Sequence, residues 1–201
     1  MDHQWLQDLV LANHILFNEG VLDGFGHVST RDPSNPGRFH IARMIAPALV
    51  TADDILEVDL DGVVHDNQNR RTYAERFIHS EIYRARPDVR SVVHSHSPTV
   101  IPFGVTGTRL RPVCHMSGFL GNETPVYEIR DFAGERSSLL VTDRELGKAL
   151  ADTLGARNVA LMRGHGSVAT GSSIRQAVYR AIYTEINASS LKYSFQARLM
   201  G

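Results

Sequence analysis

The sequence predicts a single α/β domain, and three observations support this. The chain has 201 residues, of which 42% are apolar and 21% are charged, a composition that suits one domain with a full hydrophobic core. Segments with apolar residues at helical spacing alternate with short apolar runs of strand length. Glycine and proline separate these segments, and the sequence contains no internal repeat, low-complexity tract or domain linker. We therefore expect one domain over residues 1–201.

The first quarter of the chain predicts a helix followed by two strands. Residues 2–19 have helical spacing, and Gly20 is a C-terminal cap signal. The apolar stripe of this helix consists of Leu6, Leu9, Val10, Leu16 and Phe17. A glycine-rich turn at residues 24–26 then opens into a strand, and residues 39–45 predict a second strand. We expect the helix to pack on the core.

Residues 46–64 predict a turn, a short helix and a hairpin. Thr51 and Asp54 have the spacing of a capping box, with Asp in place of the usual Glu or Gln. Asp61 and Gly62 stand between two strand-like runs and supply the positive φ angles of a two-residue turn. These residues are therefore expected to have structural roles.

The C-terminal half predicts three helices and two strands. A short helix over residues 97–104 is expected to be capped by Ser97 and to start at Pro98. The other segments are strands at 125–129 and 158–162 and amphipathic helices at 143–154 and from 172 to about 198. The apolar positions of the last helix are Ile174, Val178, Ala181, Ile182 and Ile186.

A helix followed by a strand carries most of the chemistry. Residues 74–86 predict the helix, with Glu75 in its first turn, and residues 90–96 predict a short buried strand. Because strand side chains alternate, His94 and His96 share one face, with their imidazoles roughly 6–7 Å apart. Such a pair can supply two ligands to one metal ion, and Glu75 can reach back over the strand end. The alternative is a pair of hydrogen-bonded core histidines.

A third histidine favours the metal interpretation. His165 follows an apolar strand, and Gly164 and Gly166 on either side allow the backbone to come close to a ligand. Three imidazoles that leave an open position are the pattern of catalytic zinc, whereas structural zinc is usually closed by four ligands. With Cys114 as the only cysteine, a closed thiolate site is excluded. We expect one divalent ion, with Zn²⁺ as the first choice and Mn²⁺ or Fe²⁺ as the alternatives.

Four short motifs follow one another along the chain. They are Glu75-x-x-x-His79, Arg86-Pro87-Asp88, His94-Ser95-His96-Ser97-Pro98 and Gly164-His165-Gly166. In this order they resemble the class II aldolase/adducin family, which includes sugar-phosphate aldolases, an epimerase and several decarboxylases. The resemblance runs from about Leu6 to Tyr193.

The resemblance implies a fold, an assembly and residue roles. The fold would be a three-layer α/β/α sandwich around a mixed, mostly antiparallel central sheet, and the assembly a homotetramer with active sites at subunit interfaces. His94, His96 and His165 match the metal ligands, and Glu75 matches the catalytic glutamate. His115 falls near the segment where fuculose-phosphate aldolase carries a tyrosine proton donor that crosses a subunit interface. That tyrosine is missing here, so His115 becomes the candidate catalytic residue.

The expected pocket differs from that of the sugar-phosphate relatives. Those relatives bind phosphate through hydroxyl and amide groups where this chain has His27, Ala46, Ala48, Tyr73 and Ala74. A buried anion without donors is costly, and guanidinium is the preferred partner of a carboxylate. We therefore expect a small-molecule carboxylate substrate. The candidate substrate-binding residues are His27, Ser29, Arg43, Tyr73 and Arg76, with Tyr73 or Phe25 stacking on a ring. The alternatives are a structural hydrogen bond for His27 and surface ion pairs for the arginines.

A metal ion beside a carboxylate stabilises an enolate, the shared step of aldol cleavage and decarboxylation. The pocket favours a metal-dependent lyase that decarboxylates a hydroxylated aromatic or heteroaromatic carboxylic acid. The alternatives are a class II aldolase acting on a small hydroxy-keto acid or sugar, a non-catalytic adducin-like interaction domain and, more remotely, an iron oxygenase.

Charge and hydropathy exclude several other classes of function. With 21 basic and 22 acidic residues, the chain has no electrostatic footprint for nucleic acid or an anionic membrane. No apolar run approaches the ~20 residues of a membrane span, and the first residues do not resemble a signal peptide. The single cysteine fits a reducing compartment. We therefore expect a cytoplasmic protein.

Overall fold

The computed structural model describes residues 4–66 and 68–200, with side chains described up to Ser194. The strands are β1 (His27–Arg31), β2 (Arg38–Ala42), β3 (Ile55–Asp59), β4 (Val64–His65), β5 (Ser91–Ser95), β6 (Val126–Tyr127), β7 (Val159–Met162) and β8 (Gly166–Gly171). The α-helices are α1 (Gln4–Asn18), α2 (Arg76–Ala85), α3 (Ile101–Val105), α4 (Arg130–Ala133), α5 (Arg144–Leu154) and α6 (Ile174–Met200). The 3-10 helices are η1 (Pro47–Leu49), η2 (Ala52–Asp54) and η3 (His115–Leu120).

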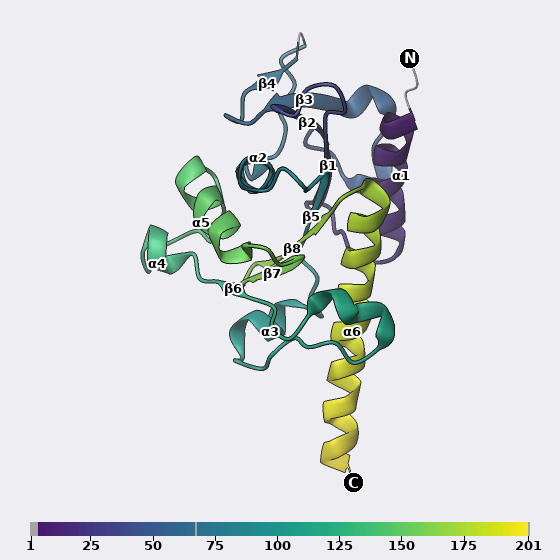
Figure 1. The fold of residues 1–201 in the computed structure, drawn as a ribbon, viewed down its shortest axis with the longest axis vertical. Coiled ribbons are helices and arrows are strands. Elements are labelled where there is room, and N and C mark those ends of the chain that lie inside the picture. Colours follow the sequence, from purple (N-terminus) through teal and green to yellow (C-terminus); the bar gives the residue numbers. More distant parts are fainter. Residues whose placement is uncertain (1–3, 67, 201) are drawn as a thin grey trace.

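An eight-stranded mixed sheet forms the middle layer, in the order β4-β3-β2-β1-β5-β8-β7-β6. Among the described strands, β6 and β7 pair in parallel and every other pairing is antiparallel. Figure 1 shows helices on both sides of this sheet. The mixed, mostly antiparallel sheet and the α/β/α layering that the resemblance implies are therefore confirmed.

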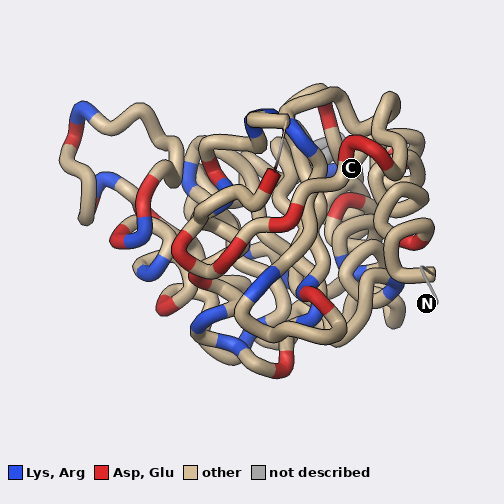
Figure 2. Tube along the Cα trace, turned by 90° about the horizontal axis from the view of Figure 1, so that it is seen from above, with Lys and Arg blue, Asp and Glu red and all other residues tan. Residues whose placement is uncertain are grey.

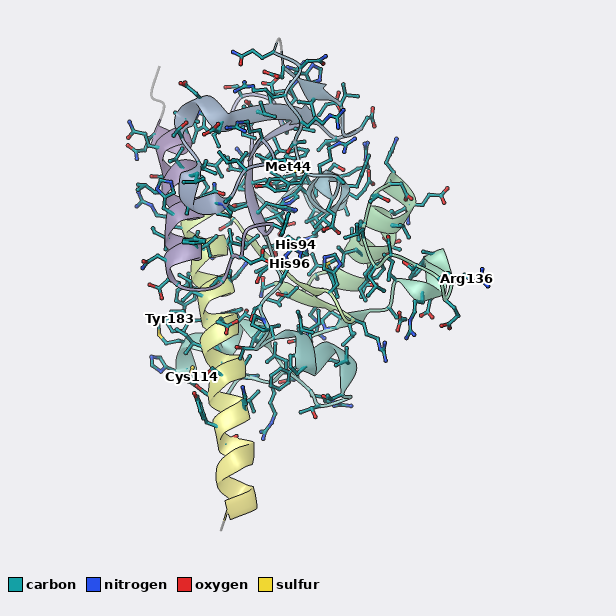
Figure 3. All side chains as sticks on the ribbon, turned by 180° about the vertical axis from the view of Figure 1, so that it is seen from behind. Met44, His94, His96, Cys114, Arg136 and Tyr183 are labelled. Carbon is teal, nitrogen blue, oxygen red and sulfur yellow. The ribbon has the colours of Figure 1, made fainter. Side chains whose placement is uncertain are left out.

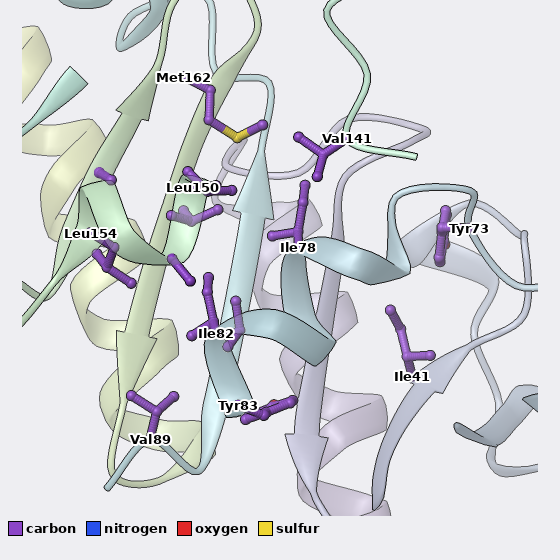
Figure 4. Close-up of a cluster of buried hydrophobic side chains, with 14 of the residues drawn as sticks. Ile41, Tyr73, Ile78, Ile82, Tyr83, Val89, Val141, Leu150, Leu154 and Met162 are labelled. Carbon is purple, nitrogen blue, oxygen red and sulfur yellow. The ribbon is translucent and has the colours of Figure 1, made fainter. Parts of the chain in front are cut away.

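Different helices cover the two faces of the sheet, each over its own apolar cluster. On one face, α2 and α5 contribute Ile78, Ile82 and Leu150 to a buried cluster, which Figure 4 shows in close-up. On the other face, α1 and α6 cover a cluster that includes Leu9 and Leu16. Full burial of an aliphatic side chain stabilises a fold by roughly 1.5–3 kcal/mol. These two clusters hold the helices against the sheet and so fix the ends of the strands that carry the site.

Both terminal helices are present, and α1 ends and α6 begins within two residues of the predicted bounds, whereas residues 2 and 3 of the first predicted helix lie outside the described residues. Not every predicted apolar position is buried. Leu9 of α1 is fully buried, whereas Phe17 is 45% exposed. On α6, Ala181 is buried and Ile186 is 41% exposed. The predictions for Phe17 and Ile186 are wrong because consecutive helical positions are about 100° apart, so a stripe assigned from spacing alone is wider than the face that packs. In the described part of the chain, no helix is long and apolar enough to cross a membrane.

Acidic and basic residues are interspersed along the whole trace, as Figure 2 shows. This distribution agrees with the nearly balanced count of 21 basic and 22 acidic residues.

The turn between β3 and β4 differs from the predicted two-residue turn. The backbone N–H of Asp59 donates to Val63 O, so the turn contains three residues, and only Gly62 of these has a positive φ, of 81°. The Asp59 carboxylate accepts the N–H groups of Asp61 and Val63. These hydrogen bonds stabilise the longer turn, in which one left-handed residue is enough.

Local capping explains two further segments. The predicted capping box is present, because the N–H of Thr51 donates to Asp54 Oδ2 over 2.8 Å at the start of η2. The helix predicted over residues 97–104 instead begins at Ile101, with Pro102 in its first turn. Ser97 caps a separate turn before it, so the prediction of Pro98 as the first helical residue is wrong.

The strand β8 was not predicted from the sequence. Its residues, Gly-Ser-Val-Ala-Thr-Gly, are mostly small and do not form the apolar run that marked the other strands. In the structure β8 lies between β5 and β7 and is buried along its whole length. A Cβ on Gly166 would overlap Ser95 O, so the strand approaches β5 more closely than a side chain allows.

Gly166→Ala is therefore expected to destabilise the protein by at least about 3 kcal/mol, because the clash is with backbone and no flexible side chain can move aside. Urea unfolding measures this. Gly118→Ala is the matched control, since nothing lies within 4 Å of the position that its Cβ would take and its φ is not positive. Equal stability of the two variants would contradict the predicted close approach.

Candidate metal centre

Four side chains from separate parts of the chain converge beyond the C-terminal end of β5. His94 lies on β5, His96 follows it, Glu75 precedes α2, and His165 lies in the turn between β7 and β8. Their ligand atoms all lie within 4.8 Å of one another. His94 Nε2 is 2.9 Å from His96 Nε2, and Glu75 Oε2 is 3.6 Å from His94 Nε2 and 3.4 Å from His165 Nε2. Figure 3 shows His94 and His96 in the interior of the molecule. The structure thus brings together the four residues singled out in the sequence.

Each of the three imidazoles has a hydrogen-bond acceptor at its outer nitrogen, Nδ1. For His94, His96 and His165 the acceptors are Ser167 O at 3.1 Å, Asp23 Oδ1 at 3.1 Å and Leu139 O at 2.7 Å. An acceptor at Nδ1 favours the tautomer with its hydrogen there and leaves the Nε2 lone pair free. Partners of this kind orient metal-binding histidines. The donor set and its hydrogen bonds therefore fit a divalent ion.

The carboxylate of Glu75 is held in place from two sides. Its Oε1 accepts the N–H of Val141 over 2.9 Å, and its Oε2 faces the imidazoles. Burial opposes ionisation, but hydrogen bonds with His165 and His94 outweigh it, so the pKa of Glu75 lies well below its usual range. Glu75 is therefore ionised at neutral pH.

The histidines of the cluster differ in their proton affinity. Burial lowers the pKa of His94 to about 4, which makes it a neutral ligand at neutral pH. Burial also opposes protonation of His165, but the hydrogen bond and charge of Glu75 outweigh it and raise the pKa of that imidazole. A metal ion that binds His165 therefore competes with a proton more strongly than one that binds His94.

A pocket of about 290 Å³ opens beside the cluster. It is lined by Phe25, His27, Met44, Tyr73, Ala74, Glu75, His96 and Leu140. Phe25, Met44 and Leu140 are exposed and form an apolar rim, and Figure 3 labels Met44 in the same region as His94 and His96. Apolar walls around a few polar groups are typical of small-molecule sites and suit a flat ring.

Of the five predicted substrate-binding residues, His27 and Tyr73 line this pocket, whereas Ser29, Arg43 and Arg76 do not. His27 is buried against His94, with ring centroids 5.0 Å apart, and its Nδ1 is 2.7 Å from His79 Nε2. Tyr73 packs on His27, and its hydroxyl donates to Ile45 O, so its ring is part of the wall. Ser29 is fully buried and bonds to other buried side chains, so the prediction of a substrate contact for Ser29 is not supported by its position.

The other predicted site residues lie outside the lining of this pocket. Arg43 forms an ion pair with Asp54 over 2.6 Å, the alternative considered from the sequence. Arg76 donates to Gly62 O and lies over a phenyl ring next to it on α2. His115 is an exposed residue at the start of η3 and is not part of the cluster. These three residues are close to site segments in the sequence, but within one chain their side chains do not line the pocket.

A second group of possible metal ligands consists of Asp32 directly after β1, His40 on β2 and Glu57 on β3. His40 Nε2 is 2.7 Å from Asp32 Oδ2 and stacks on Trp5, and Glu57 pairs with Arg38. These groups already have protein partners that account for their positions. The Glu75 cluster is therefore the stronger candidate for a metal centre.

The sequence did not reveal the groups that orient the ligands. Two of them, Leu139 O and the N–H of Val141, belong to the backbone of one loop and leave no residue-type signal. Asp23 carried a weak signal, because an Asp before a glycine-rich turn often accepts backbone N–H groups, as it does here from Phe25 and Gly26.

Asp23→Asn is expected to lower metal affinity about tenfold, because the amide can still accept the turn hydrogen bonds but loses the charge that orients His96. Competition with a chromogenic chelator measures the affinity. Asp53→Asn, at an exposed position outside the cluster, is the control and should bind metal like the wild type. Unchanged affinity in Asp23→Asn would show that this contact does not orient the ligand.

The layered fold and the cluster of three histidines and a glutamate at the end of its sheet define the class II aldolase type of protein. The chain belongs to this family: the family model described as Class II Aldolase and Adducin N-terminal domain matches residues 7–190.

Its relatives include two named decarboxylases. The chain is 44% identical over 191 residues to decarboxylase tropJ of Talaromyces stipitatus, covering 87% of this chain and 70% of the relative. It is 32% identical over 189 residues to 3,4-dihydroxyphthalate decarboxylase of Arthrobacter keyseri, covering 87% and 72%. Among solved structures, L-fuculose 1-phosphate aldolase from Glaciozyma antarctica PI12 has a TM-score of 0.80 at 26% identity, covering 96% of this chain and 74% of that one. The family and these relatives indicate a lyase, either a decarboxylase or an aldolase.

Proposed function

We propose that the protein is a metal-dependent decarboxylase of a hydroxylated aromatic or heteroaromatic carboxylic acid. The observation that carries this proposal is the ionised Glu75 carboxylate beside three imidazoles whose Nε2 atoms converge, next to a pocket with an apolar rim. Zinc is our first choice of metal and manganese or iron the alternatives, because imidazole ligands suit several divalent ions.

The roles of the residues follow from their positions. When bound, a divalent ion supplies Lewis-acid stabilisation of a developing enolate or phenolate oxygen. Glu75 is buried and ionised, and its free oxygen faces the cluster, so it can accept a proton and return it to the ring carbon that loses carbon dioxide. Phe25, Met44 and Leu140 hold the ring by apolar contact and limit the access of water.

The pocket supports a carboxylate substrate over a phosphate. No lysine or arginine is among its lining residues, and Ala74 lines it at a position where the family resemblance implies a hydroxyl group in the sugar-phosphate relatives. A phosphate dianion would therefore lack donors, which is costly when it is buried. A carboxylate with an adjacent hydroxyl group needs fewer protein donors, because both oxygens can approach a bound ion. Both relatives are named decarboxylases, which supports a carboxylate substrate, and the name 3,4-dihydroxyphthalate decarboxylase supports a hydroxylated aromatic one.

Metal analysis followed by a carbon dioxide release screen tests this function. The acids to screen are hydroxybenzoates, dihydroxyphthalates and hydroxypyridine carboxylates, each with protein reloaded with zinc, manganese or iron. We expect release that depends on added metal for at least one of these acids. Faster cleavage of fuculose-phosphate-like sugars than of any aromatic acid would instead favour the aldolase alternative.

The adducin-like alternative predicts a protein with no turnover. The intact cluster of Glu75 and three histidines argues against this, since an interaction module has no need of converging imidazoles with oriented tautomers. The oxygenase alternative has the weaker support: a relative named 4-hydroxy-3-prenylphenylpyruvate oxygenase/4-hydroxy-3-prenylbenzoate synthase is 28% identical over 156 residues, against 44% over 191 residues for decarboxylase tropJ.

We further propose a homotetramer in the cytoplasm in which the exposed His115 reaches the site of a neighbouring subunit. The apolar side chains exposed on α1, such as Leu11 and Ile15, support an assembly by offering a surface to bury. Sedimentation at micromolar concentration is expected to give a tetramer, and a monomer would remove both the assembly and the role of His115.

A further inference from the structure

A chain of four buried polar side chains runs from the core to the pocket. The phenol of Tyr83 lies 2.7 Å from Ser29 Oγ, Ser29 Oγ lies 2.7 Å from His79 Nδ1, and His79 Nε2 lies 2.7 Å from His27 Nδ1. All four residues are at most 1% exposed. His27 and Ser29 belong to β1, and the other two residues belong to α2, which packs on the same face of the sheet. The metal-binding function proposed above does not use this chain.

The chain ends beside the metal centre because of strand register. His27 is the direct cross-strand partner of His94, so both side chains lie on the same face of the sheet. His27 and His79 are at most 1% exposed, which disfavours a charged ring, and the 2.7 Å contact between their facing nitrogens needs one acceptor, so the pair is neutral. Each neutral ring then has one donor and one acceptor nitrogen.

The hydrogen bonds along such a chain can all point toward the pocket or all point away from it. Tyr83, at the inner end, distinguishes the two directions. If each group donates away from the pocket, the hydroxyl hydrogen of Tyr83 is left over. Its oxygen lies against Ser29 Oγ and the backbone of Val92, and the Val92 contact favours the ionised phenol, as an N–H group that donates to the oxygen does. If each group donates toward the pocket, Tyr83 donates to Ser29, Ser29 to His79 and His79 to His27, and every buried hydrogen is used. A buried donor without a partner disfavours a state by about 5- to 150-fold, so the second direction dominates.

The outer end of the chain then has a defined polarity. With its Nδ1 accepting from His79, His27 carries its hydrogen on Nε2. The other polar groups in the lining are committed: the Tyr73 hydroxyl donates to Ile45 O, and His96 Nδ1 donates to Asp23. His27 Nε2 is thus the one lining donor without a protein partner among the described side chains.

We propose that the buried chain from Tyr83 through Ser29 and His79 fixes His27 as a hydrogen-bond donor to an anionic oxygen of the ring acid bound beside the metal centre. The identity of this ligand rests on the proposed function, whereas the direction of the chain does not. His79, Ser29 and Tyr83 are positioning residues, and His27 is a specificity-determining residue. The pocket therefore accepts a carboxylate or phenolate oxygen at this position and rejects a donor such as an amide N–H₂ group.

The direction of the chain is tested without any substrate. In zinc-loaded protein labelled with ¹⁵N-histidine, long-range ¹H–¹⁵N spectra distinguish a protonated ring nitrogen from an unprotonated one. His27→Gln and His79→Gln assign the two signals by their loss. We expect both rings to carry the hydrogen on Nε2. A hydrogen on Nδ1 of His27 in the wild type would overturn the proposal.

The consequence for binding is tested with salicylate, whose affinity for the zinc-loaded protein calorimetry measures. His27→Leu is expected to weaken binding about tenfold or more, the effect of losing a hydrogen bond to a charged oxygen, whereas His27→Gln, which keeps an N–H donor, should recover most of it. Equal affinity of the Leu variant and the wild type would overturn the role of His27.

Ser29→Ala tests whether Ser29 positions His79 and His27, and Ser91→Ala is its matched control. Both serines are fully buried on adjacent strands, and Ser91 donates only to Ser29 O, outside the chain. Ser29→Ala is expected to give a mixture of His79 tautomers and severalfold weaker salicylate binding, and Ser91→Ala to change neither. Identical spectra and affinities for the two variants would show a structural role only. If no aromatic acid is decarboxylated but the tautomers are as expected, the proposed function fails while the direction of the chain stands.

Discussion

His94→Ala is expected to lose its bound divalent ion and its lyase activity together. His94 is fully buried and its Nε2 faces the other ligands, so alanine removes one of the converging donors. Mutation of a residue that only orients a metal ligand lowers metal affinity by about 10- to 100-fold. Loss of the ligand itself should therefore lower it by at least about 10²-fold. Elemental analysis after gel filtration, together with turnover at saturating metal, measures both quantities.

His40→Gln provides the control for this variant. His40 is also buried, but it belongs to the separate group with Asp32 and Glu57. The control variant is expected to keep both metal and activity, although it should be less stable because its contact with Trp5 is lost. Full metal occupancy in His94→Ala with loss of metal in His40→Gln would place the ion in the other group and reject the assignment of the centre.

Glu75→Gln is expected to keep the fold and most of the metal while turnover falls by roughly 10² or more, because a neutral amide cannot serve as the proton acceptor. The amide oxygen can still accept the N–H of Val141, so the loop that also holds His165 should stay in place. The kcat and KM of the best aromatic acid, measured with matched metal content, give the size of the effect.

Glu81→Gln is the matched control for this second variant, since Glu81 is also buried and lies on α2, but it pairs with Arg84 and Arg144 away from the cluster. Its kcat should stay near that of the wild type. If Glu75→Gln also turns over at the wild-type rate, Glu75 has only a structural role. It then serves as the residue before α2 whose carboxylate accepts the N–H of Val141.

Local sequence patterns predicted the helices better than they predicted the pairing of the strands. Helices α2 and α5 follow from local spacing and caps, as shown by Asp143, whose side chain accepts the N–H of Leu146 at the first turn of α5. β8 escaped prediction because its residues are small, and its burial between two strands depends on neighbours that are distant in sequence. Patterns of a few residues report local preference, and they carry no information on which strands will pair.

Arg43 and Arg76 illustrate the same limit for the pocket. Both stand next to site segments in the sequence, and guanidinium is a good partner for a carboxylate. In the structure each has a closer partner, Asp54 or Gly62 O, which the sequence did not indicate. Proximity along the chain therefore predicts that a residue is near a site, but packing decides whether its side chain faces it.

The sequence by itself determined the four residues of the cluster, because the alternation of a strand aligns His94 with His96 and each remaining residue lies in a short motif. The tertiary structure decided which tautomer each histidine adopts, through Ser167 O, Leu139 O and Asp23. It also decided that His27 ends a buried hydrogen-bonded chain. The physical reason is that backbone carbonyls and cross-strand neighbours supply these contacts: every residue type has a carbonyl, and which neighbours meet is set only when the sheet and its helices have packed.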